Sequence, residues 1–194
     1  MSKSTSSFRL PISDLPESAK ALQWPQQAMR ERDWKGATER WAIIRKSYPD
    51  QVEAWVQCAV AHMELKEMEQ AGKLLDRARD RFPSNPEPLT YSAELAMRAG
   101  KLDEAGTYLR LARLQFPSVM QSWIKSAQYA ELTGNADRAL EYNQQARDRW
   151  PEHPAPLQQY AELAMRDKSW ETALQRWEEV RRRFPKQPAG YLRA

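Results

Sequence analysis

The sequence has few of the residues on which disulfide-rich or membrane-spanning proteins depend. It has one cysteine, Cys58, so no internal disulfide can form, and no run of about 18 apolar residues that would cross a membrane. Only 6 of its 194 residues are glycine, whereas alanine, glutamate, arginine, leucine and glutamine are abundant. Because straight-chain side chains lose little rotamer freedom in a helix, this composition predicts an all-α protein.

The chain also has no block of charge of one sign. Its 30 basic and 26 acidic residues, a formal net charge of +4, are interleaved along the sequence. We therefore expect neither nucleic acid nor a membrane as a partner. The first 17 residues are rich in serine and contain no apolar stretch long enough for a signal peptide, which predicts a flexible tail on a cytoplasmic protein.

A period of 34 residues runs through the rest of the chain. Proline recurs at this spacing, each time after an aromatic residue, at Pro49, Pro83, Pro117, Pro151 and Pro185. Counting this proline as position 32 gives repeats at 18–51, 52–85, 86–119, 120–153 and 154–187, with a partial sixth at 188–194. Alanine then occupies position 20 in every repeat and position 8 in four of them. Small residues in fixed columns are typical of two helices that approach each other closely.

The chain resembles the tetratricopeptide repeat (TPR) family, and in particular its bacterial members. The resemblance rests on the spacing, the small residues at positions 8, 20 and 27, the closing proline and the tryptophans at position 4, Trp55 and Trp123. The resemblance covers roughly nine tenths of the chain. It implies an all-α, right-handed α-solenoid in which each repeat is a helix-turn-helix, with helix A at about positions 1–14 and helix B at about 18–31. The predicted organisation is a tail over 1–17 and a solenoid over 18–194.

The turn between the two helices is expected at position 15. Gly100 and Gly134 stand there in repeats 3 and 4, where a left-handed conformation would end helix A. The other three repeats have larger residues at this position, which predicts strain or a different geometry: Arg32, Lys66 and Lys168.

Repeat 1 departs from the pattern because Pro25 stands at position 8, in the middle of its expected helix A. Proline there removes a hydrogen bond and clashes with the preceding turn. We therefore predict a short helix over 16–23 and a restart at Pro25, followed by a regular helix B over 34–48.

The resemblance implies a protein–protein interaction scaffold whose concave groove binds a peptide or helix of a partner. In this family the groove is formed mainly by positions 2, 5, 9, 12 and 13 of helix A. The residues predicted to contact the partner are Val60, Met63, Glu94, Met97, Arg98, Gln128, Glu131, Glu162, Met165 and Arg166, and position 13 of repeat 4 adds Leu132.

Two features of these columns leave alternatives open. Residues 93–98 and 161–166 share the segment AELAMR, which is either a repeated peptide-reading element or helix sequence kept after duplication, with Glu and Arg paired one turn apart. Arginine fills position 28 of every repeat (Arg45, Arg79, Arg113, Arg147 and Arg181), which suits either an acidic partner or, as we favour, a structural role at the helix end.

The sequence contains no motif that indicates catalysis or a cofactor. Cys58 and His62 share one helical face, but two ligands without others nearby make no zinc site, and a satisfied core pair is expected. No phosphate loop, nucleophile elbow or metal spacing occurs, so we predict neither enzymatic activity nor a cofactor or metal. Most tryptophans, including Trp170 and Trp177, are predicted to pack in the core.

Two other roles remain open. The repeats are similar to those that accompany bacterial cell-envelope glycosyltransferases, so the chain is alternatively the N-terminal recruiting or regulatory region of a larger enzyme. A sixth repeat that is only begun favours this view. Because the last hairpin of a solenoid leaves an apolar flank, self-association through the C-terminal flank is the other alternative.

Overall fold

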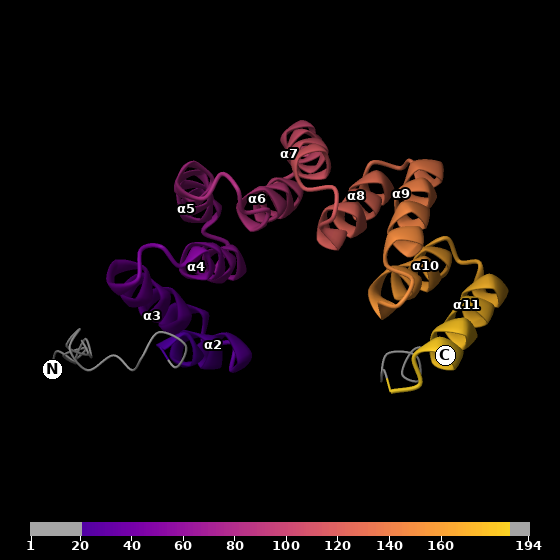
Figure 1. The fold of residues 1–194 in the computed structure, drawn as a ribbon, viewed down its shortest axis with the longest axis horizontal. Helices are drawn as coiled ribbons and strands as arrows, with labels where there is room; N and C mark the ends of the chain where they lie inside the picture. The colour runs from indigo at the N-terminus through magenta and orange to yellow at the C-terminus, as the bar shows by residue number, and fades with distance from the viewer. Residues whose placement is uncertain (1–20, 187–194) are drawn as a thin grey trace, which may run out of the picture. The chain divides into compact units, whose positions relative to one another are not determined.

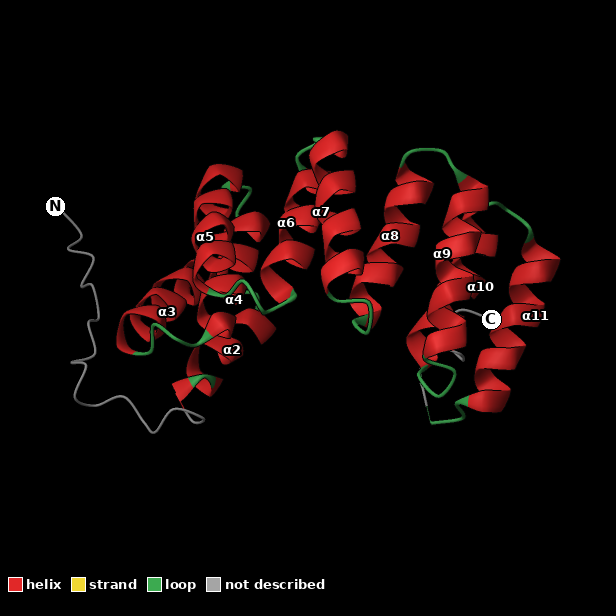
Figure 2. Cartoon of the chain, turned by 45° about the horizontal axis from the view of Figure 1, so that its top comes forward, coloured by secondary structure: helices red, strands yellow, loops and turns green. Residues whose placement is uncertain are grey.

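The computed structural model describes residues 21–186, which form ten α-helices and no strand (Figures 1 and 2). The helices are α2 (Gln23–Arg30), α3 (Trp34–Ser47), α4 (Val52–Glu64), α5 (Met68–Arg81), α6 (Glu87–Arg98), α7 (Leu102–Gln115), α8 (Met120–Leu132), α9 (Ala136–Arg149), α10 (Pro154–Arg166) and α11 (Trp170–Arg183). Consecutive pairs of helices correspond to the five repeats, so that the even-numbered helices are the A helices and the odd-numbered ones the B helices.

The chain divides into two compact units, Met1–Tyr91 and Ser92–Ala194, and the boundary falls within α6. In the first unit, α3 packs against α2 and α4, and α4 also packs against α5. In the second unit, α8 packs against α7 and α9, and α10 against α9 and α11. Within each unit these helices therefore pack against their neighbours in the sequence, as expected of stacked hairpins.

The small-residue columns are buried, as the period predicts. At position 20 the buried alanines are Ala37, Ala71, Ala105, Ala139 and Ala173, and at position 8 they are Ala59, Ala93, Ala127 and Ala161. None of these nine side chains is more than 4% exposed. In the second unit, Ala139 of α9 packs with Ala130 of α8 and Leu163 of α10. Small side chains thus let three helices meet at one point.

All five turns between helices A and B have the same left-handed residue. The φ angles are 73° at Gly100 and 76° at Gly134, and 58°, 61° and 58° at Arg32, Lys66 and Lys168. All five turns also share one hydrogen bond. The backbone N–H of the residue after the left-handed residue donates to the carbonyl of the fifth residue before it, as Glu67 N–H does to the His62 carbonyl (2.9 Å). The three non-glycine turns therefore keep the family geometry and carry the predicted strain.

Repeat 1 differs from the expected arrangement at Pro25. Helix α2 begins at Gln23, two residues before the predicted restart, and the buried Pro25 lies within its first turn. Proline is tolerated there because the first N–H groups of a helix have no acceptor within it. The short helix predicted over 16–23 lies mostly outside the described residues, and helix B over 34–48 is confirmed to within one residue as α3, Trp34–Ser47.

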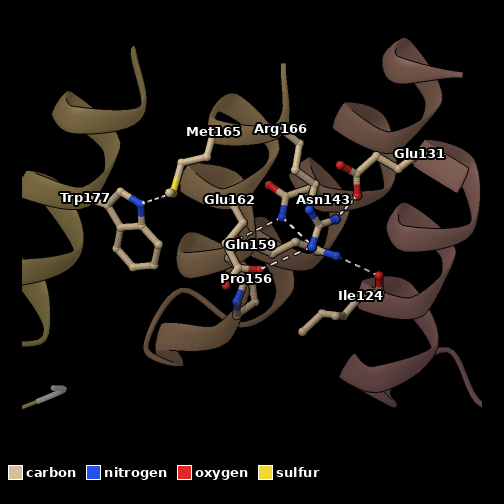
Figure 3. Close-up of polar contacts among 9 residues, drawn as sticks. All are labelled: Ile124, Glu131, Asn143, Pro156, Gln159, Glu162, Met165, Arg166 and Trp177. Carbon is tan, nitrogen blue, oxygen red and sulfur yellow. Dashed lines mark hydrogen bonds and ion pairs between the residues drawn. The ribbon is translucent and has the colours of Figure 1, made fainter. Parts of the chain in front are cut away.

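A buried polar network joins three helices of the second unit (Figure 3). Asn143 occupies position 24, where the other repeats have Trp41, Leu75, Leu109 and Trp177. Its Nδ2 donates to the Pro156 carbonyl (2.8 Å) and to Gln159 Oε1 (3.1 Å), and Gln159 Nε2 donates to the Ile124 carbonyl (2.8 Å). The network links α9 to α10 and α10 to α8, and the partners offset the cost of burying two amides.

Replacing Lys66 or Lys168 with glycine should raise the free energy of unfolding by roughly 0.5–1 kcal/mol, because glycine adopts a positive φ without a Cβ clash. Urea unfolding followed by circular dichroism measures the change. The exposed Arg77, inside α5, provides a control, since Arg77→Gly should instead cost about 1 kcal/mol. Equal losses at Lys66 and Arg77 would show that the turn carries no strain.

Candidate functional site

Three A helices of the second unit line an open hollow of about 420 Å³. Met97 comes from α6, whereas Gln128, Glu131 and Leu132 come from α8 and Arg166 from α10. All five stand at groove positions 9, 12 or 13 of their repeats. The hollow therefore brings together part of the predicted set, and we refer to it below as the groove hollow.

Leu132 is the main apolar surface of the groove hollow. It is the last residue of α8, and 56% of it is exposed. Met97 is half-buried beside it on the same rim. An exposed leucine next to a methionine gains free energy when another apolar side chain covers it, and methionine adapts its shape to the covering group.

Between α6 and α8, the carboxylate of Glu94 lies between two cations. Lys125 Nζ of α8 is 2.5 Å from one of its oxygens, and Arg98 of its own helix is 2.8 Å from the other. Burial raises the pKa of Glu94, but Lys125 and Arg98 together outweigh burial, so the pKa is lowered overall. Glu94 therefore remains ionised and bridges α6 to α8.

Between α8 and α10, one arginine lies near two carboxylates. Arg166 of α10 makes an ion pair with Glu131 of α8 and lies 3.9 Å from Glu162 of its own helix (Figure 3). Burial raises the pKa of Glu131; Arg166 opposes this rise and Glu162 adds to it, so the pKa is raised overall. An adjoining hollow of about 460 Å³ extends toward α11 and is lined by Glu131, Arg166 and Asp167 among others.

Both copies of AELAMR place their glutamate and arginine near each other, one turn apart on the same helix. In residues 93–98 the Glu94–Arg98 pair forms within one helix, as predicted for helix sequence kept after duplication. In residues 161–166, Arg166 also reaches the preceding A helix. A role of either segment in reading a peptide stays a prediction.

Two of the predicted groove methionines do not face a partner. Met165 accepts a hydrogen bond at Sδ from the indole N–H of Trp177 (3.1 Å), which directs it into the α10–α11 interface. Met63, in the first unit, is only 2% exposed. Both side chains are thus packed within the protein, whereas Met97 at the same position 12 lines the groove hollow, and their part in a binding surface stays a prediction. Val60, also in the first unit, is half-buried.

The arginine column makes contacts within the protein. Arg45 stacks on Trp55 (5.1 Å), Arg113 on Tyr142 (4.4 Å) and Arg147 on Tyr160 (3.8 Å); each arginine thus reaches an aromatic ring of the next repeat. Burial lowers the pKa of Arg113, and Tyr142 opposes this effect. These cation–π contacts support the structural role that we favoured for the column.

The remaining sequence candidates also have structural partners. The buried Cys58 thiol donates to the Thr38 carbonyl (3.8 Å), and burial raises its pKa. His62 Nδ1 lies 2.6 Å from Glu67 Oε2. Trp177 is buried, as predicted, but Trp170 is 64% exposed, so its assignment to the core was wrong.

The described residues contain neither a metal-ligating cluster nor a membrane-spanning helix. Within residues 21–186, no group of three or more His, Cys, Asp or Glu side chains is placed to hold a metal ion. Over the same residues, no helix has the length and apolar character needed to cross a bilayer.

The sequence model of the family described as "Tetratricopeptide repeat" matches residues 26–86 and 92–154, which is more than half of the chain. The chain therefore belongs to the tetratricopeptide repeat family, and its fold is an all-α solenoid of such repeats. Members of this family generally mediate contacts between proteins. No curated protein sequence gives a significant match.

Similar solved structures have the same fold. A thermophilic TPR protein from Thermus thermophilus is 18% identical with a TM-score of 0.77, over 91% of this chain and 96% of that one. MamA from Desulfovibrio magneticus, from residue 41 to its end, is 16% identical with a TM-score of 0.60, over 89% and 98%. Yeast Tom70 is 16% identical with a TM-score of 0.69, over 84% of this chain and 35% of Tom70. At these identities the similarity concerns the fold alone.

Glutamine substitutions at Glu94 and Glu131 should have opposite effects on stability. The lowered pKa of Glu94 means that its ionised form stabilises the folded state above the ordinary glutamate pKa of about 4.3. Glu94→Gln should therefore lower the free energy of unfolding by about 1 kcal/mol at pH 7. The difference should vanish as the pH falls through the lowered pKa.

Glu131→Gln is the matched control. Because the pKa of Glu131 is raised, the folded protein holds its proton more tightly than the unfolded chain does. At pH 7 the variant should be no less stable than the wild type, and the wild type should gain on it as the pH falls through the raised pKa. Urea unfolding between pH 3.5 and pH 7 measures both differences, and a loss of similar size at both sites at pH 7 would contradict this assignment.

Proposed function

We propose that the protein is an interaction scaffold that binds a peptide or helix of a partner protein through the groove hollow. The observation that carries the proposal is the exposed Leu132 beside the ion-paired Glu131 and Arg166 on the rim of a hollow that three A helices line. Its surroundings are those of a binding site: an apolar anchor point lies at the centre and polar groups around it.

The rigidity of the rim supports the same proposal. Glu131 of α8 is held by Arg166 of α10, and the ion pair restricts the rotation of both side chains. Side chains that are ordered before binding lose less conformational entropy when a partner docks. The groove hollow therefore offers a surface whose shape is set in advance.

Replacing Leu132 with glutamate should reduce the recovery of a bound partner by about tenfold or more, because a charge would then occupy the apolar centre of the hollow. The measurement is affinity capture by the full chain from a lysate of the source organism, with quantitative mass spectrometry. Leu114→Glu is the matched control, since Leu114 is 71% exposed on α7 and lies outside the hollow. Equal recovery by the wild type and Leu132→Glu would exclude the groove hollow as the binding surface.

A second candidate function is self-association through the flank of α11, where Trp170 and Leu174 are 64% and 48% exposed. They stand at positions 17 and 21 of repeat 5. In earlier repeats position 21 lies against the next A helix. In repeat 1 the Thr38 carbonyl accepts a hydrogen bond from the Cys58 thiol, and in repeat 3 a Cβ added to Gly106 would lie 2.7 Å from the Tyr129 hydroxyl oxygen. The same apolar face on a second copy is a complementary partner in a two-fold dimer.

Recruitment for a larger bacterial enzyme stays a prediction from the sequence.

If α11 mediates self-association, sedimentation velocity should show a dimer whose fraction increases with protein concentration. Trp170→Glu should abolish the dimer, because two copies would then bring like charges into an apolar contact. Leu114→Glu again serves as the control and should leave the dimer unchanged. A monomer at every concentration would rule out this role for the flank.

A further inference from the structure

The hollow that adjoins the groove hollow reaches beyond the A helices. Its volume is about 460 Å³, and we refer to it as the second hollow. Its lining comes from α8, α9, α10, α11 and the turn between α10 and α11. Of the lining residues only Glu131 and Arg166 stand at groove positions, and both of them also line the groove hollow. The two hollows therefore meet at the Glu131–Arg166 ion pair (Figure 3).

The apolar part of the second hollow comes from α9 and α10. Ala139 of α9 and Leu163 and Ala164 of α10 are at most 8% exposed and form a buried floor. Leu140 of α9 lines the same hollow and is 39% exposed. An exposed leucine beside a buried apolar floor gains free energy when another apolar group covers it. The second hollow thus has an apolar surface of its own, separate from that of Leu132.

The charged side chains of the second hollow balance one another. The lining has two carboxylates and two guanidinium groups, which belong to Glu131, Asp167, Arg166 and Arg176. Glu131 makes its ion pair with Arg166, and Asp167 Oδ2 accepts a hydrogen bond from Ser169 Oγ (2.7 Å). The lining therefore attracts neither an anion nor a cation through a net charge of its own.

Arg176 is held in place by one tyrosine of the neighbouring helix. Its Nη1 donates to the Tyr160 carbonyl (2.8 Å), and its guanidinium carbon lies 3.5 Å from the centre of the Tyr160 ring. A charged ligand group would have to displace contacts of this kind or be buried without a partner, which is costly. An uncharged apolar side chain leaves all of these contacts in place.

We propose that the second hollow takes a large uncharged apolar side chain, such as leucine or phenylalanine, from the same polypeptide segment that covers Leu132 in the groove hollow. This inference rests on the proposed function and adds a second anchor residue to it. Pockets of about 300–1,000 Å³ enclose whole small ligands, so the second hollow has room for the largest apolar side chains. Two anchors on one chain bind more tightly than either alone, because the second binds without a further loss of translational freedom.

The test begins with a phage-displayed library of random 12-residue peptides selected on the full chain. The selected peptides should share two large apolar residues at a constant spacing. Synthetic copies of the best peptide then carry alanine at one anchor or at the other, and fluorescence anisotropy measures their binding. Each alanine should weaken binding by roughly tenfold, because each removes one buried apolar side chain.

Two variants of the protein assign each anchor to its hollow. The peptide should bind Leu140→Glu roughly tenfold more weakly, and alanine at the second anchor should then cause little further loss. Leu132→Glu should show the same relation to the first anchor. Leu114→Glu lies outside both hollows and is the matched control, which should bind each peptide as the wild type does. Circular dichroism melting of each variant separates a lost contact from a lost fold.

Nuclear magnetic resonance of leucine methyl groups gives a second readout on the unaltered protein. The methyl signals of Leu140 and Leu163 should shift when the peptide is added, since both side chains line the second hollow. The copy with alanine at the second anchor should shift them much less. The methyl signals of Leu114 should stay unchanged with either peptide.

The outcomes separate this inference from the function on which it rests. If the selected peptides depend on Leu132 but not on Leu140, or leave the methyl signals of Leu140 and Leu163 unchanged, then the groove hollow binds partners and only the second anchor is overturned. If they depend on Leu140 but not on Leu132, then the proposed function of the groove hollow fails, and so does a single segment across both hollows. If no peptide is selected, or the peptides depend on neither leucine, both fail. A charged residue at the second anchor also overturns the inference.

Discussion

The close approach of neighbouring helices at alanine is the contact on which the rest of the molecule depends. Alanines at positions 8 and 20 are buried in all the repeats that have them. A larger side chain there would push the helices apart, because protein interiors are too densely packed to absorb extra volume. Once these faces are paired, positions 9, 12 and 13 of α6, α8 and α10 are left to line the groove hollow. The position of the groove hollow is therefore a consequence of where alanine occurs.

The features that could be predicted from the sequence are those that depend on residues within a single repeat. The proline at position 32, the glycine at position 15 and the alanine columns act through local backbone geometry or one helix contact, and the helices appear where these signals place them. Lys66 shows the strength of the packing, since it adopts the conformation of Gly100 despite its Cβ. Helix α2 begins before Pro25, where the sequence predicted the helix to restart, because a helix tolerates proline anywhere in its first turn.

The features that could not be predicted depend on which residues a neighbouring helix supplies. Met97 and Met165 belong to identical segments, but Trp177 on α11 offers Met165 an indole N–H, whereas repeat 3 has Leu109 at that position. Arg166 reaches across to α8 because repeat 4 places Glu131 at position 12, where repeats 3 and 5 have methionine. The tryptophan at position 24 and the glutamate at position 12 were visible in the sequence, but their effect appears only when the two helices are placed side by side.

The ion pairs of the groove hollow also limit how a partner can use them. Lys125 and Arg166 each tie one A helix to the next, so a ligand charge that displaced either cation would break a contact between helices as it formed its own. A ligand that left these pairs intact would avoid that loss, so the contacts that stack the A helices favour a ligand that binds beside the ion pairs and does not replace them.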